Sequence, residues 1–291
     1  MDFIRELNTF EVYHKNTSVA YALPPYENAY RYKYALPMER LNCIRWWTVE
    51  VFQRHWYHGI TISFLYFFTI KAIQKAMEKR KAFSLRTTLF LWNASLAAFS
   101  IVGLVRFSED IFQTIYNHGL LKSLCLPSRT DDVAAFWILA FTLSKVVELG
   151  DTLFIVLRKK RLIFLHYYHH AAVLIYALHS AAEHSNPGRT FVFMNYLAHS
   201  CMYTYYALAT FGRLPRWVSM SVTTVQTVQM LAGVTITFVV YKVKTESWMP
   251  CQQSMGNLYL AMILYATFAV LFLQFFYRAY IVKSLKKSKT E

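Results

Sequence analysis

Three histidines lie close together in the run His166-Tyr167-Tyr168-His169-His170, inside a stretch that has no Asp, Glu, Lys or Arg from 162 to 182. Positions i, i+3 and i+4 of a helix share one face, so these side chains are expected to form one polar stripe. A neutral imidazole can accept and release an acyl group, move a proton or bind a metal ion. A lone histidine is usually a hydrogen-bonded core residue, but three on one stripe indicate a reactive site.

Further polar residues interrupt neighbouring apolar segments. Ionisable residues in a bilayer cost roughly 2.5–3.5 kcal/mol each, so Lys145, Glu148 and Asp151 need a partner or a cavity. The simpler interpretation of Lys145 and Glu148 is an ion pair in which the two charges neutralise each other and have no further role. For amides alone, hydrogen bonds between helices are the simpler interpretation. At 1.5 Å per residue, however, the polar groups fall in one band about 6–20 Å from the same end of their helices, which predicts a buried polar chamber. The remaining members of this set are Asn195, His199, Met202, Tyr203, Gln226 and Gln229.

The composition indicates that membrane helices position these groups. Of the 291 residues, 56% are hydrophobic, 18% aromatic and only 16% charged, which disfavours a disordered, collagen-like or ordinary soluble chain. Windows long enough to cross a bilayer, with few or no charges, predict seven spans. They separate a segment 1–56, which contains an amphipathic interfacial helix at 39–56, from a membrane domain 57–281 and a tail 282–291. The predicted spans are 57–77, 87–105, 133–157, 162–182, 190–212, 217–241 and 255–277.

The positive charge predicts the orientation of the chain. The formal net charge is +15, and Lys and Arg gather in loops that alternate threading places on one side, at 71–86, 158–161, 213–216 and after 278. That side is expected to be cytosolic, so the N-terminus is lumenal and the C-terminus cytosolic. A glycosylation sequon at Asn16 agrees with this orientation. The tail carries a dilysine signal at Lys287 and Lys289, which predicts residence in the endoplasmic reticulum membrane.

Four cysteines are too few and too scattered for a CxxC metal site or a disulfide framework. With this threading Cys125 and Cys251 both lie in lumenal loops, where oxidising conditions allow a bridge, and we predict that bridge. Cys201 lies within a span, where it is expected to be a small packing residue. Cys43 lies in the N-terminal segment.

Four ordered motifs resemble the very-long-chain fatty acid elongases. They are the Lys145-Val146-Val147-Glu148-Leu149-Gly150-Asp151-Thr152 run, the histidine box, the run from His199 to Tyr203 and the pair Gln226/Gln229. The resemblance covers all seven spans. It implies an all-α polytopic membrane protein whose seven transmembrane helices surround an enclosed acyl tunnel. It also implies condensation of a long-chain acyl-CoA with malonyl-CoA, giving 3-oxoacyl-CoA, CO₂ and CoA with no cofactor or metal. Gly150 and Tyr168 resemble the branch that acts on saturated or monounsaturated chains.

The resemblance also implies roles for individual residues. His169 would form an acyl-imidazole and His199 would be its partner in the condensation, while four neighbours fix tautomers or hold oxyanions: His166, His170, Asp151 and Asn195. Substrate contacts are expected from Glu148, Tyr203, Gln226 and Gln229. The CoA phosphates are expected to bind among basic residues that could equally be topology signals: Lys145, Arg158, Lys159, Lys160, Arg161 and Arg278.

The expected partners are acyl-CoA, malonyl-CoA, the lipid bilayer and the 3-oxoacyl-CoA reductase, dehydratase and enoyl reductase of an elongation cycle. A homodimer is compatible with the sequence, and no nucleic acid is expected. Two other classes stay open. A di-iron membrane desaturase or hydroxylase also has an HxxHH box, but it needs several such boxes. A seven-span receptor or transporter would explain buried charges but not the ordered motifs. Within the condensing class, Cys201 is a rival nucleophile.

Overall fold

The computed structural model describes residues 7–8, 29–40, 46–126, 128–129, 132–246 and 249–282. Within these ranges the chain is helical and has no strand, which confirms the predicted all-α class. The sequon at Asn16, the cysteine at Cys43 and the tail lysines lie outside the described residues, as does the stretch 41–45 of the predicted interfacial helix.

Each of the seven predicted windows overlaps one or two helices. Within the described residues, four helical segments are long and apolar enough to cross a membrane, fewer than the seven spans predicted: Arg86–His118, Val133–Leu157, Arg216–Thr245 and Met255–Val282. The described helices are η4 Pro37–Glu39, η5 Trp47–Gln53, α3 His58–Met77, α4 Arg86–His118, α5 Leu120–Ser123, α6 Val133–Val147, α7 Gly150–Leu157, α8 Phe164–Glu183, α9 Asn186–Ala209, α10 Arg216–Thr245, α11 Met255–Phe276 and η6 Tyr277–Val282.

Helix α4 continues well beyond the window 87–105, where charged residues ended the apolar pattern. These charges do not end the helix because they have partners on other elements. Arg106 pairs with Glu39 at 2.7 Å, and Asp110 pairs with Arg189 at 3.1 Å. Paired charges can continue a helix past the apolar window, so hydropathy alone placed the end of this helix too early.

The window 133–157 is also helical but is interrupted between α6 and α7 at Glu148 and Leu149. Helix α6 begins at a cap, because the Asp132 carboxylate accepts a 2.8 Å hydrogen bond from the Val133 N–H. Helix α7 begins at Gly150, where an added Cβ would lie 2.8 Å from the Trp92 ring of α4. The glycine therefore lets α4 approach the interruption closely.

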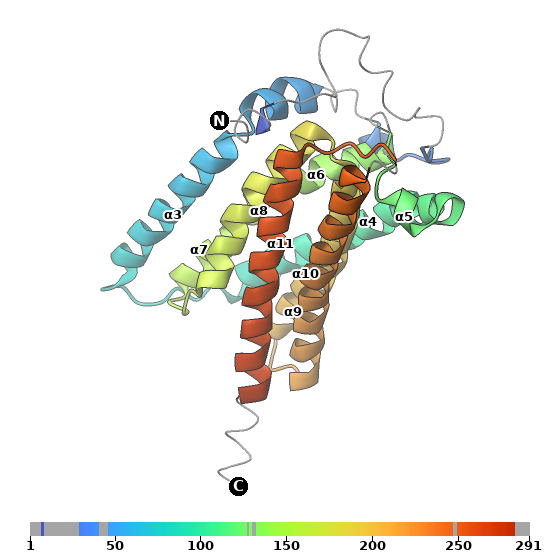
Figure 1. Cartoon of the computed structure of the whole chain (residues 1–291). Coiled ribbons are helices and arrows are strands. Elements are labelled where there is room, and N and C mark those ends of the chain that lie inside the picture. The colour runs from blue at the N-terminus through green and yellow to red at the C-terminus, as the bar shows by residue number, and fades with distance from the viewer. Residues whose placement is uncertain are drawn as a thin grey trace.

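The long helices pack side by side and their loops divide between two ends (Figure 1). Helix α4 packs along α9, α10 packs against α9 and α11, and α8 contacts α3, α6 and α11. One end, here the basic end, carries the α3–α4 connection, residues 158–161, residues 213–216 and η6. The other, the disulfide end, carries residues 29–40 and the Cys125–Cys251 disulfide, which confirms the predicted bridge. Cys201 is a free, half-buried thiol in α9.

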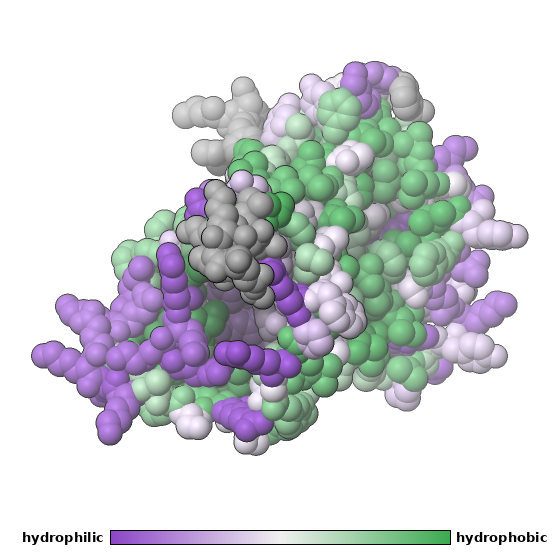
Figure 2. Space-filling model, turned by 90° about the horizontal axis from the view of Figure 1, so that it is seen from below, coloured by the Kyte–Doolittle hydropathy of each residue, from purple (hydrophilic) through white to green (hydrophobic). Residues whose placement is uncertain are grey.

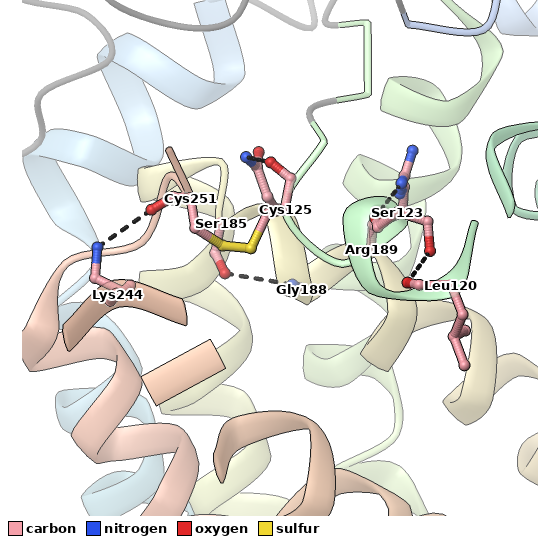
Figure 3. The surroundings of a disulfide bond; sticks show 9 residues. Leu120, Ser123, Cys125, Ser185, Gly188, Arg189, Lys244 and Cys251 are labelled. Atoms are coloured by element: carbon pink, nitrogen blue, oxygen red, sulfur yellow. Dashed lines mark hydrogen bonds between the residues drawn. A yellow bond between two sulfur atoms is a disulfide. The ribbon is translucent and has the colours of Figure 1, made fainter. Parts of the chain in front are cut away.

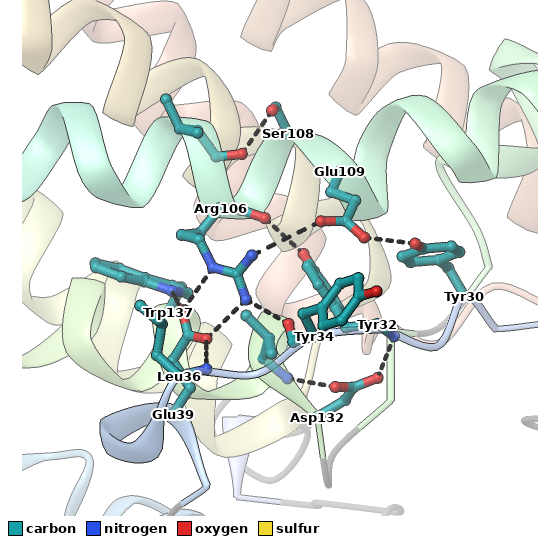
Figure 4. A network of polar contacts seen from close by, with 12 residues as sticks. Tyr30, Tyr32, Tyr34, Leu36, Glu39, Arg106, Ser108, Glu109, Asp132 and Trp137 are labelled. Atoms are coloured by element: carbon teal, nitrogen blue, oxygen red, sulfur yellow. Dashed lines mark hydrogen bonds and ion pairs between the residues drawn. The ribbon is translucent and has the colours of Figure 1, made fainter.

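At the disulfide end, the segment 29–40 is fixed to α4 and α6 by buried polar contacts (Figure 4). The Glu39 carboxylate accepts hydrogen bonds from the Arg106 guanidinium, from the Trp137 indole at 2.8 Å and from the Leu36 N–H at 2.8 Å. Burial opposes ionisation of Glu39, but these donors outweigh it and hold the pKa of the carboxyl below its ordinary value of 4.5. The Tyr32 N–H donates to Asp132 at 2.9 Å.

Candidate active site

A cavity of about 890 Å³, here the polar cavity, extends from the basic end into the helix bundle. Its wall brings together most of the polar residues that the sequence placed in one band, although Lys145 and Glu148 do not line it. Those of the band that line it come from the α7, α8, α9 and α10 helices, so the predicted chamber exists. Among its lining residues are Asp151, Arg158, His166, His169, His170, Asn195, His199, Met202, Tyr203, Gln226 and Gln229.

The three histidines of α8 all line this cavity, as the i, i+3, i+4 spacing predicted. The His166 and His170 rings have centroids 4.5 Å apart. The His166 Nε2 atom lies 2.9 Å from the Thr152 hydroxyl of α7, which lies 2.5 Å from the Tyr66 hydroxyl of α3. The His170 Nε2 atom is 3.9 Å from a carboxylate oxygen of Asp151. Two of the histidines thus have polar neighbours on α7.

His169 differs from them. Its ring packs against Phe268 of α11, with centroids 4.9 Å apart, and against Phe272 at 6.3 Å. In the described part of the chain, no group hydrogen-bonds to its imidazole. The ring is therefore held in place by aromatic contacts while its nitrogen atoms remain available for chemistry.

The carboxylate of Asp151 is held by two donors from other helices. The Trp92 indole of α4 donates to one oxygen at 2.6 Å, and the Tyr203 hydroxyl of α9 donates to the other at 2.7 Å. The Tyr203 ring in turn lies edge-on to the His199 ring, with centroids 5.3 Å apart. Asp151 therefore links α7 to α4 and α9 beside the histidine stripe.

Lys145 and Glu148 form the ion pair that the sequence allowed, and a third residue joins it. The Lys145 ammonium lies 2.8 Å from a Glu148 oxygen and donates to the Asn195 amide oxygen at 2.8 Å. The same Glu148 oxygen accepts a 2.9 Å hydrogen bond from Ser144 and lies 3.6 Å from Nδ1 of His199. The pair is buried, and it orients one amide and one imidazole of α9.

The predicted substrate contacts divide into two groups. Arg158, Lys160 and Arg161 line the polar cavity, as do the polar residues of α9 and α10. Four others are not among its lining residues. Lys145 and Glu148 bind each other, the Lys159 ammonium donates to the carbonyls of Glu78 and Arg80 at 3.1 Å, and Arg278 lies in η6.

Two further cationic residues, Arg86 and Arg213, line the polar cavity and were not predicted as substrate contacts. Both belong to basic loops that were counted only as orientation signals. Arg86 donates to the carbonyls of Thr210 and Phe211, so it joins the start of α4 to the end of α9. Figure 2 views the molecule from this end and shows hydrophilic side chains gathered on one side of a hollow, with apolar residues over much of the remaining face.

A second cavity of about 80 Å³, here the narrow cavity, runs from the histidine stripe toward the disulfide end. It shares four lining residues with the polar cavity: His169, Asn195, Gln229 and Met230. Much of its remaining wall is apolar, including Val173 and Phe191. His169 thus lies where a wide polar cavity meets a narrow, largely apolar one.

The alternative di-iron class would require His and carboxylate side chains that converge on the metal ions. Across the described ranges, no three His, Cys, Asp or Glu side chains converge as metal ligands would. The arrangement instead combines an accessible imidazole, a nearby amide donor and fixed carboxylates, which suits acyl transfer with stabilisation of an oxyanion.

Comparison with known proteins gives consistent matches. The model of the family described as ELO, GNS1/SUR4, matches residues 51–288. A putative fatty acid elongase 4 of Caenorhabditis elegans is 58% identical over 290 residues, which cover 99% of this chain and 97% of that protein. A very long chain fatty acid elongase 6 of Drosophila melanogaster is 42% identical, over 77% of this chain and 72% of its own length. The elongase 6 of Homo sapiens is 38% identical, over 84% and 92% respectively.

Proposed function

This chain belongs to the GNS1/SUR4 family of fatty acid elongases, and we propose that it is the 3-oxoacyl-CoA synthase of an elongation cycle. The enzyme condenses a long-chain acyl-CoA with malonyl-CoA and releases CO₂ and CoA. The observation that carries this proposal is the place of His169 at the junction of the two cavities. There an acyl chain fits the narrow apolar side while its thioester faces the wide polar side.

The first half-reaction transfers the acyl group to His169. The free imidazole nitrogen attacks the thioester carbonyl, an N–C bond forms, and the C–S bond breaks. The thiolate of CoA takes the imidazole proton and leaves as the thiol. Aromatic packing against Phe268 holds the ring at a fixed angle during this step. The product is an acyl-imidazole whose chain lies in the narrow cavity.

The second half-reaction uses malonyl-CoA. Loss of CO₂ leaves an enolate, whose carbon attacks the acyl carbon, and His169 leaves and takes up a proton. His199 is the partner imidazole for this step, with Nδ1 oriented by Glu148 at 3.6 Å. The Lys145 ammonium donates a hydrogen bond to the Asn195 amide oxygen, so the N–H₂ group of Asn195 can donate to an oxyanion in the cavity.

The other polar residues act by position. Asp151 fixes Tyr203 and lies beside His170, while Thr152 orients His166. Gln226 and Gln229 contact the substrate from the α10 side of the cavity. These contacts set the tautomers and ring angles that the two half-reactions need.

The CoA phosphates bind at the basic end. Guanidinium groups match phosphate geometry with paired hydrogen bonds, and five cationic side chains surround this part of the polar cavity. Three of them were expected from the sequence and two are added by the structure. They are Arg158, Lys160, Arg161, Arg86 and Arg213.

The protein's setting follows from the same arrangement. We place seven crossings in the membrane domain 57–281, around a tunnel formed by the two cavities, with the basic end cytosolic and the disulfide end lumenal. The Cys125–Cys251 bridge supports this orientation because disulfides persist in the oxidising lumen of the endoplasmic reticulum. The N-terminal segment 1–56 is then lumenal and the tail 282–291 cytosolic. A reductase, a dehydratase and an enoyl reductase would consume the 3-oxo product.

The test uses purified protein with a saturated acyl-CoA, malonyl-CoA and no reductant. A 3-oxoacyl-CoA two carbons longer, formed with one CO₂ for each product, is the expected result. A desaturated or hydroxylated product together with stoichiometric bound iron would instead support a di-iron enzyme. Tight binding of either CoA ester without turnover would support a receptor or transporter.

A further inference from the structure

The narrow cavity follows one face of α8. Six α8 residues and His184, directly after the helix, line it, and five of these seven follow each other at spacings of three and four: His169, Val173, Tyr176, Ser180 and His184. At 1.5 Å per residue, the path from His169 to His184 is about 22 Å long. An acyl chain bound to His169 therefore extends along this face toward the disulfide end.

At its far end the narrow cavity is lined by residues of three separate segments. Ser128 and Arg129 follow α5, Ser185 and Asn186 lie at the turn between α8 and α9, and Gln252 precedes α11. We call these three segments the cap. It consists of the described residues of 123–129, of 183–189 and of 251–254. Cap residues are the last that an acyl chain meets along the face of α8.

The cap segments are joined to one another through covalent and hydrogen bonds (Figure 3). The Cys125–Cys251 disulfide links the first to the third. The Asn186 side-chain amide donates to the Cys125 carbonyl at 2.6 Å, and its backbone N–H donates to the Gln252 carbonyl at 3.0 Å. The Gln252 side chain donates to the Glu183 carbonyl at 2.9 Å. Among the cap residues that the structure describes, the disulfide is thus a covalent link between segments that hydrogen bonds also join.

Further contacts join two of the cap segments and fix the cap to the helices, independently of the disulfide. Arg189 donates to the Ser123 carbonyl at 2.6 Å and pairs with Asp110 of α4. The Lys244 ammonium of α10 donates to the Cys251 carbonyl at 3.2 Å. Without the bridge, the first and third cap segments would be linked to each other through hydrogen bonds to residues 183–189, which are easier to displace than a covalent bond.

We propose that the Cys125–Cys251 bridge sets the longest acyl chain that the enzyme elongates, by keeping the cap segments together at the end of the narrow cavity. The two cysteines are positioning residues that do not touch the reacting atoms. A longer chain must displace the cap, and a covalent link between two of its segments opposes that displacement. This inference rests on the proposed condensing function.

The experiment compares wild type with Cys125→Ser, Cys251→Ser and the double variant. Cys43→Ser is the matched control, because it removes a cysteine of the N-terminal segment and leaves the Cys125–Cys251 bridge intact. Each protein is assayed with saturated acyl-CoAs that increase by two carbons, with malonyl-CoA, and kcat/KM is measured for each length. For the shortest acyl-CoA that is too long for wild type, we expect kcat/KM to rise by about tenfold in the bridge variants. A change of this size is expected because one or two methylenes in an apolar pocket give about tenfold discrimination.

For shorter chains, kcat/KM of the bridge variants should stay within about threefold of wild type, and Cys43→Ser should keep the wild-type profile. A proportional fall at every length, with the cutoff unchanged, would show that the bridge only stabilises the fold and would overturn the proposal. If the variants do not fold, folded wild-type protein is treated with a thiol reductant and alkylated, and reduction is confirmed by mass. An unchanged cutoff after complete reduction would equally overturn it. Absence of any 3-oxo product from wild type would refute the condensing function instead.

Discussion

Removing one charge of the Lys145–Glu148 pair should destabilise the protein strongly. The ammonium and carboxylate lie 2.8 Å apart and both side chains are buried. At an effective dielectric constant of about 20, this separation corresponds to an attraction of about 6 kcal/mol, which offsets the cost of removing both ions from water. Lys145→Met or Glu148→Gln alone leaves a buried charge without its partner. We expect each to lower the free energy of unfolding by about 3–5 kcal/mol.

The double variant separates stability from catalysis. Lys145→Met with Glu148→Gln removes both charges, so its loss of stability should be smaller than the sum of the single losses by about 1–3 kcal/mol. Condensation should stay impaired, because His199 no longer has a carboxylate 3.6 Å from Nδ1. Unfolding of the detergent-solubilised protein gives the first quantity and the rate of 3-oxo product formation gives the second. Additive losses, or a double variant with wild-type kcat, would refute this reasoning.

Three further predictions follow from packing, pH and charge. Gly233→Ala places a Cβ 2.1 Å from the Tyr265 ring and should cost about 1–3 kcal/mol in thermal unfolding, whereas Gly212→Ala, with nothing within 4 Å, should be nearly neutral. The lowered pKa of Glu39 stabilises the fold above the ordinary value of 4.5, and this contribution is lost as the pH falls through the folded-state pKa. The difference in melting temperature between wild type and Glu39→Gln should therefore shrink from about pH 6 to about pH 3, and a constant difference would contradict it. Arg161→Gln should raise KM for both CoA substrates by about tenfold at low salt with little change in kcat, and less at high salt.

Much of the fold was predictable because a helix that crosses a bilayer needs about 20 apolar residues, and apolar windows of that length can be found in the sequence. All seven windows overlap helices, of which four described segments are long and apolar enough to cross a membrane, and the predicted bridge between Cys125 and Cys251 is present. The far end of α4 was not predictable from hydropathy. Its charged residues are stabilised by Glu39 and Arg189, which are distant in sequence, and no local pattern reports such partners.

The site was predictable where helical spacing alone decided it. The three histidines of α8 share one cavity because i, i+3 and i+4 lie on one face. The spacing does not determine whether the Lys145 side chain points into the cavity or toward Glu148. That direction depends on how α6 packs against α9. Arg86 and Arg213 were counted as topology signals because a basic loop residue has the same sequence signature whether it meets water or a ligand.

The most direct test of the account is the intact mass of the protein after incubation with acyl-CoA alone. Wild type should gain one acyl group and His169→Ala should gain none, while His199→Ala should still form the adduct but lose condensation with malonyl-CoA. Peptide mapping should then locate the acyl group on His169. An adduct of the same mass in His169→Ala, or one located on Cys201, would contradict the central claim that this imidazole carries the acyl chain.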